Sequence, residues 1–126
     1  MNERGSVTVL TAGSLFLVCV LCLVAVDLFR VLDVKARAQT AADAAALAAA
    51  RELAIPSFTS PEEAAAQYAQ LNGGTLKECT CERGSLEATV AVEVPVRLVF
   101  LSSTRPQVIG RARAVVDVGG PGQSRP

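Results

Sequence analysis

The sequence predicts an α+β protein in which a single N-terminal transmembrane helix continues into a long helix that supports a small antiparallel β-sheet. Three observations indicate this fold class. An uncharged apolar run occupies residues 5–26, close to the N-terminus. An alanine-rich stretch without Pro or Gly follows it at 27–54. Beyond residue 74, the spacing of the apolar residues changes from the helical period of 3.6 to the strand period of two.

Composition limits the classes of function. The chain has 126 residues, enough for one domain, and its 12 basic and 12 acidic residues cancel, which gives no electrostatic reason to expect a nucleic-acid partner. There is no histidine, so Ser-His-Asp catalysis and His-ligated zinc are excluded. Aromatic residues make up only 4% of the chain, with no Trp. We therefore expect no enzyme activity, no cofactor, no metal and no small-molecule substrate.

The first element is predicted to be a transmembrane helix at 6–26, preceded by a short leader at 1–5. The 22 uncharged residues from 5 to 26 would span about 33 Å at about 1.5 Å per residue, enough for a hydrocarbon layer of about 30 Å. Asp27 is the first charge after this run, and we place the membrane boundary there. A cleavable secretory signal is the alternative, although no small-x-small site closely follows the apolar core.

The second element is predicted to be an alanine-rich helix at 27–54 that continues the first, because no Pro or Gly interrupts it. Pro56 stops it, since the residue before a proline avoids helical geometry. Small apolar residues recur along this helix at 3-4-3-4-3 spacing, which is typical of a packing seam. The seam consists of Val31, Val34, Ala38, Ala41, Ala45 and Ala48. It packs either against helices of other subunits or against this chain's own small domain, and the sequence leaves both interpretations open.

A shorter helix is predicted at 61–72. Ser60 is a good N-cap for it, Pro61 suits the first helical position, and Glu63 completes a capping box. The Asn-Gly-Gly sequence at 72–74 is a typical helix end.

About three strands are predicted beyond this helix, at about 76–82, 86–97 and 107–118. Apolar and polar residues alternate along them, as expected for a sheet with one buried and one exposed face. Pro95 indicates a sheet edge or a strand end. Residues 119–126 are rich in Gly, Pro and Ser and are predicted to be a disordered tail. Residues 27–118 would then form one α+β domain.

Cys79 and Cys81 form a C-x-C sequence on the first predicted strand. Residues two apart in a strand share a face, and their Cα atoms lie near the upper limit for a disulfide. A local disulfide would indicate an oxidising compartment. Free thiols, or a bond between two chains, are the alternatives.

Several motifs resemble the TadE/TadG-like proteins of the tight-adherence (Flp-type) pilus machinery. They are the opening ERGSVTVL at 3–10, the apolar run that ends at Asp27, and ARAQTAADAAALAAA at 36–50. The short form with one transmembrane helix resembles the actinobacterial TadE-like proteins. The resemblance implies a pilin-like domain and a role as a minor pilin or pseudopilin, a structural or assembly component of a pilus or secretion apparatus. Its partners would be the membrane, other subunits of the machinery and copies of itself.

The orientation of the body is predicted differently by charge and by resemblance. Arg30, Lys35 and Arg37 follow the membrane run and outnumber Arg4 before it, so the positive-inside rule places the body in the cytoplasm. The resemblance implies a single-pass anchor in the inner (cytoplasmic) membrane with the C-terminal body extracytoplasmic, at the cell surface. The C-x-C pair agrees with the second arrangement, which we adopt.

The resemblance also implies cleavage by a prepilin peptidase between Gly5 and Ser6. In prepilins of this type, a Glu usually stands at the fifth mature position, where this chain has Leu10. An uncut membrane-anchored accessory protein is therefore an alternative to a filament subunit. Two other hypotheses stay open: an anchored extracytoplasmic binding module outside any filament, and a small secreted domain with a cleaved signal.

Overall fold

The computed structural model describes residues 3–99 and 106–117 and confirms the predicted α+β class. Two helices are followed by one sheet of three antiparallel strands, in the order β1-β2-β3. The elements are α1 (Glu3–Ala54), α2 (Pro61–Leu71), β1 (Thr75–Thr80), β2 (Glu87–Pro95) and β3 (Gln107–Val115). The predicted tail at 119–126 and the first two residues of the predicted leader lie outside the described residues.

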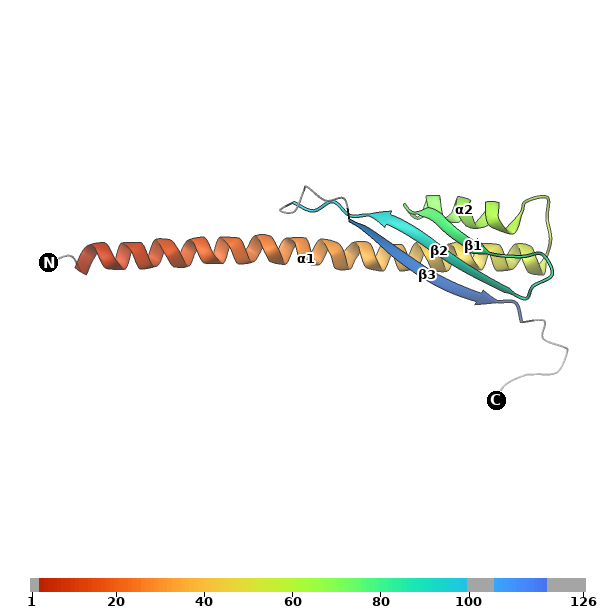
Figure 1. Cartoon of the computed structure of the whole chain (residues 1–126), viewed down its shortest axis with the longest axis horizontal. Coiled ribbons are helices and arrows are strands. Elements are labelled where there is room, and N and C mark those ends of the chain that lie inside the picture. Colours follow the sequence, from red (N-terminus) through yellow and green to blue (C-terminus); the bar gives the residue numbers. More distant parts are fainter. Residues whose placement is uncertain (1–2, 100–105, 118–126) are drawn as a thin grey trace, which may run out of the picture.

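Helix α1 is continuous through the predicted membrane boundary, and its sequence contains no proline that would kink or break it. Figure 1 shows its N-terminal half projecting beyond the sheet, while its C-terminal half packs against α2, β2 and β3. Strand β1 packs against β2 and α2. The helix ends just before Ile55 and Pro56. Glu52 secures this end, because its Oε2 accepts hydrogen bonds from the Ser57 amide at 3.1 Å and the Ser57 hydroxyl at 2.6 Å.

Both ends of α2 follow the chemistry that the sequence predicts. The Ser60 hydroxyl accepts a hydrogen bond from the Glu63 amide at 3.1 Å, and Glu63 Oε2 accepts one from the Ser60 amide at 3.3 Å. This is a capping box, which satisfies two amides that the helix leaves free. At the other end, Gly73 has a φ of 77° and the Gly74 amide donates to the Ala69 carbonyl at 2.9 Å. This arrangement is a Schellman motif, which favours glycine because it needs a left-handed residue.

Strand β2 is the centre of the sheet and forms its buried face. Ala88, Val90 and Val92 are buried against the helices, and Val90 and Val92 are the largest fully buried side chains among the described residues. Pro95 lies at the end of β2, where its lack of an amide does not interrupt the ladder. In β1, the register slips between Leu76 and Glu78, so Lys77 is the extra residue of a β-bulge.

The two layers approach each other closely because small residues line both sides. Most of the buried side chains contributed by the helices are alanines. Where α1 crosses β3, a Cβ atom built on Gly110 would collide with the Ala38 carbonyl and lie 2.8 Å from the Gln39 amide nitrogen. The Gln39 side chain also donates from Nε2 to the Arg111 carbonyl at 2.9 Å. Gly110 therefore sets the distance between α1 and the sheet.

Candidate functional site

The N-terminal half of α1 exposes a long apolar surface. None of its most apolar 18-residue window is buried inside the structure, and the helix is long and apolar enough to cross a membrane. Large exposed side chains occur on all of its faces, for example Leu10, Phe16 and Leu21. A helix that is apolar all round needs an apolar environment, which is either a bilayer or other helices.

The polar groups within this segment are compatible with such an environment. The Thr11 hydroxyl donates to the Val7 carbonyl at 2.8 Å, and the Ser14 hydroxyl donates to the Thr11 carbonyl at 2.9 Å. The hydroxyl protons of Thr11 and Ser14 are thus satisfied within the helix and need no water, which a bilayer core does not supply. The thiols of Cys19 and Cys22 are free and exposed, and their spacing places them on one face of the helix.

The candidate cleavage site lies in the first turns of α1. Gly5 and Ser6 are helical and exposed, and Leu10 is an exposed residue of the same helix. The structure places all three at the end of α1 furthest from the sheet (Figure 1).

At the predicted membrane boundary, α1 contacts the residues that follow β2, 96–99. Asp27 is only 7% exposed, and its Oδ1 accepts a hydrogen bond from the Val99 amide at 2.9 Å. One turn further along, Arg30 Nη1 donates to the Arg97 carbonyl at 3.3 Å. The residues after β2 therefore run beside α1 towards its N-terminus and reach the level of Asp27.

The packing seam is divided between two environments. Ala38, Ala41, Ala45 and Ala48 are buried, and Ala41 and Ala45 belong to the core cluster that α1 forms with α2 and the sheet. Val31 and Val34 are half-buried. Of the two interpretations left open by the sequence, this arrangement favours the one in which the alanines cover the chain's own domain. Ala38, Ala41 and Ala45 are completely buried and consequently not accessible to another subunit, whereas Ala48 is 9% exposed and borders an open groove.

Cys79 and Cys81 are joined by a disulfide in the structure, with their Cα atoms 5.4 Å apart. A regular strand would separate residues two apart by about 6.6 Å. The shorter distance is accommodated because β1 ends at Thr80, so that Cys81 already lies outside the strand. Both cysteines are half-buried and pack against the core.

The exposed face of the sheet carries two ion pairs. Lys77 Nζ lies 2.9 Å from Glu93 Oε2, and this hydrogen bond and the charge of Glu93 raise the pKa of Lys77 above its ordinary value of 10.5. Arg113 contacts both carboxylate oxygens of Glu87, from Nε at 2.5 Å and from Nη2 at 2.7 Å. Glu93 is buried beneath Lys77, and Glu87 lines a shallow hollow of about 280 Å³ together with Thr80, Glu82, Ser85 and Thr89.

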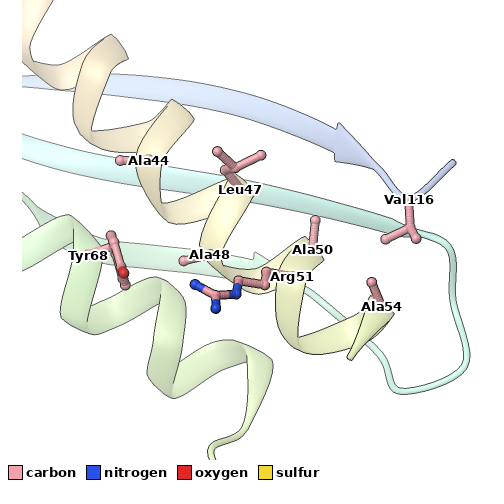
Figure 2. Close-up of a pocket in the computed structure, with 8 residues that line it drawn as sticks. All are labelled: Ala44, Leu47, Ala48, Ala50, Arg51, Ala54, Tyr68 and Val116. Carbon is pink, nitrogen blue, oxygen red and sulfur yellow. The ribbon is translucent and has the colours of Figure 1, made fainter. Parts of the chain in front are cut away.

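A shallow apolar groove of about 510 Å³ lies at the C-terminal end of α1, between α2 and the end of β3. Figure 2 shows Leu47 and Ala50 of α1 on the side of Val116, and Arg51 on the side of Tyr68. The guanidinium of Arg51 and the hydroxyl of Tyr68 are its only ionisable groups. This groove lacks the nucleophile and base, or the paired carboxylates, that catalysis would require.

Within residues 3–99 and 106–117, no group of three or more Cys, Asp or Glu side chains could hold a metal ion. The sequence interpretation missed the Asp27–Val99 bond, because it joins residues 72 positions apart, one of them in a loop. It also missed the close approach at Gly110. A glycine inside a strand pattern is a recognised signal of such an approach and could have indicated it.

Comparison with known proteins agrees with the motifs on α1. A family model described as "Putative Flp pilus-assembly TadE/G-like" matches residues 5–52, almost the whole of α1, and stops before α2 and the sheet. Neither a curated protein nor a solved structure matches the chain. Residues 5–52 are therefore similar to the TadE/G-like Flp pilus-assembly family, as the sequence motifs indicated.

Proposed function

We propose that this protein is a membrane-anchored, pilin-like component of a Tad/Flp-type pilus or a related secretion apparatus, with residues 6–26 in the inner membrane and the body on the extracytoplasmic side. The observation that carries the proposal is the unbroken α1, which exposes an apolar surface at one end and supports a folded domain at the other. Such a helix couples a subunit's position in the membrane, or in a helical assembly, to the position of its domain.

Contacts with other subunits would use the exposed half of α1. The buried alanines of the seam are occupied by the chain's own domain, and most of the large exposed apolar side chains of α1 lie in the segment before Ala38. Its exposed apolar side chains can pack against α1 of another copy or against the helix of a related subunit. The role of the alanine-rich half is then to hold the domain at a fixed distance from that contact.

Two native thiols make this contact testable. Cys19 and Cys22 are exposed on one face of the apolar segment. In membranes from cells that contain the whole apparatus, mild oxidation should link these cysteines to neighbouring subunits if that face is in contact. Single cysteines placed at 17, 18, 19 and 20 in a background without the native pair would examine the other faces. We expect crosslinks that recur with helical periodicity, and the absence of any crosslink around the whole helix would overturn the proposed packing.

The mature N-terminus distinguishes a filament subunit from an accessory anchor. Mass spectrometry of the membrane-bound protein should find Ser6 as the first residue if a prepilin peptidase cleaves after Gly5. An intact N-terminus would support a permanent anchor that assists assembly without entering a filament. A start beyond Asp27 would contradict both, because the anchor would then have been removed.

The orientation can be tested through the C-x-C pair. A disulfide is expected to persist only where the body faces an oxidising compartment. A membrane-impermeant maleimide should therefore modify Cys79 and Cys81 in whole cells only after treatment with a reductant. Modification that requires permeabilised cells would place the body in the cytoplasm, in agreement with the charge count.

A further inference from the structure

The chain that leaves β2 is fixed against α1 at the end of the apolar segment. The Val99 amide is bonded to Asp27, and the Arg97 carbonyl is bonded to Arg30. The base of this connection is closed by a hydrogen bond of 2.9 Å from the Val96 amide to the Pro106 carbonyl. Residues 96–99 are therefore held at a defined height along α1, level with the point where the uncharged run ends (Figure 1).

The apolar surface of α1 continues past Asp27 on the side of the helix away from the sheet. Leu28, Phe29 and Leu32 are 60%, 72% and 54% exposed. Leu32 lies five residues beyond Asp27, which is about 7.5 Å along a helix. A bilayer that covers this surface extends further along α1 than Asp27, and Val99 then lies within its boundary region.

The burial of Asp27 fits this position. A carboxylate at the edge of a bilayer loses part of its hydration, which is costly unless protein groups replace the water. The Val99 amide supplies one such hydrogen bond to Asp27 Oδ1. The Val99 side chain itself is 53% exposed although it is apolar. Lipid would cover the exposed part of this side chain.

The charges around the junction match a lipid surface. The side chain of Arg30 and the residues Lys35, Arg37 and Arg97 are exposed and follow the apolar surface. Long basic side chains at this height can extend to headgroup phosphates while their stems stay among apolar groups. Asp33 pairs with Arg37 at 3.0 Å and reduces this positive charge only in part.

We propose that residues 96–99 form a second membrane contact beside α1, with Val99 in the headgroup region of the bilayer. The inference rests on the proposed membrane anchoring of α1. Two contacts, the helix and this connection, would fix the rotation of the whole subunit about the axis of α1 in the membrane, because a single spanning helix leaves that rotation free. The sheet would consequently present the same face at every subunit position.

Depth-dependent fluorescence quenching tests this proposal on the full chain. An environment-sensitive probe is attached to a single cysteine at Val99→Cys, in a Cys19→Ser/Cys22→Ser background with the 79–81 disulfide kept oxidised. The protein is reconstituted in phosphatidylethanolamine–phosphatidylglycerol vesicles that contain a nitroxide lipid, labelled either near the headgroup or near the chain end. Matched probes at Leu17→Cys and Phe58→Cys mark the predicted membrane interior and the exposed far end of the domain.

We expect the Val99 probe to lose most of its emission with the shallow quencher and to be protected from a water-soluble quencher. The Leu17 probe should respond to the deep quencher, and the Phe58 probe should respond only to the aqueous one. A Val99 probe that behaves like Phe58, while Leu17 is quenched by lipid, would overturn the second contact and leave the anchor intact. A Leu17 probe untouched by lipid quenchers would overturn the anchor itself, and the second contact with it.

Discussion

Substitution of Gly110 by Ala tests the closeness of α1 and the sheet most directly. The added Cβ would meet the backbone of Ala38 and Gln39, which belong to a continuous helix and cannot move aside as a flexible side chain could. Overpacking of this kind costs about 1–3 kcal/mol, and the backbone obstacle places this site at the upper end of that range. Moving β3 away would also weaken the bond from Gln39 to the Arg111 carbonyl, worth about 1 kcal/mol.

One effect opposes this destabilisation. Replacing glycine inside a strand removes conformational freedom from the unfolded chain, which stabilises the fold by about 0.5–1 kcal/mol. The steric cost is larger, so we expect a net loss of about 2–3 kcal/mol in the free energy of unfolding. For a domain of this size, that corresponds to a fall of about 8–20 °C in the melting temperature.

Thermal unfolding in detergent micelles, followed by circular dichroism and by protection from protease, measures this loss. Gly13→Ala is the matched control, because a Cβ at Gly13 has nothing within 4 Å and alanine favours the helix. The control should melt at or above the wild-type temperature. A Gly110→Ala protein that melts within about 2 °C of the wild type, less than about 0.5 kcal/mol, would refute the reasoning. It would mean that α1 and β3 can separate without loss of stability.

Three further results are expected. Ala45 is completely buried, so Ala45→Glu should cost several kcal/mol by burying an unpaired charge and should make the domain sensitive to protease. Leu47→Glu, at a side chain that is 69% exposed, should stay within about 0.5 kcal/mol of the wild type, and equal damage by both would contradict the assignment of the seam to the core. The raised pKa of Lys77 means that its ion pair with Glu93 stabilises the fold fully below pH 10.5 and is lost as the pH rises past the raised value. The free energies of unfolding in urea of the wild type and of Lys77→Met should therefore approach each other as the pH rises through that alkaline range. A difference between the two free energies that stays constant across this range would count against the ion pair. Ser60→Ala should cost about 1 kcal/mol in thermal unfolding by removing the N-cap of α2, whereas Ser60→Asp, which retains an acceptor, should lose much less.

Local chemistry made most of the elements predictable. Absence of proline makes α1 continuous, Ser60 and Glu63 start α2, and Gly73 ends it, because each effect depends on residues a few positions apart. The exposed apolar half of α1 was equally predictable, since an uncharged run of this length is apolar on every face whatever surrounds it. The C-x-C pair is also a local feature, and strand geometry alone placed its two Cα atoms near disulfide distance.

Tyr68 shows where local pattern was insufficient. Helical spacing alone would place it on one apolar face of α2 with Ala65, Ala69 and Leu71. The two alanines are buried, whereas Tyr68 and Leu71 are exposed, so α2 packs through its smaller residues. Periodicity identifies an apolar stripe but does not state how far apart the two packed elements will lie. The alanines of α1 allow a separation so small that only other small residues fit between the helices.

By itself the sequence determined the class of the fold, the long apolar N-terminal helix and the similarity of its first segment to the TadE/G-like family. The helix and the similarity depend on residues that follow one another along a single element. Tertiary structure alone decided that the packing alanines of α1 are covered by the chain's own domain, that Gly110 sets the separation of the layers, and that Asp27 is bonded to Val99. Each of these contacts joins residues far apart in the chain. The physical reason is that a small residue or a carboxylate has the same local preference whichever partner it meets, so only the arrangement of the layers selects that partner.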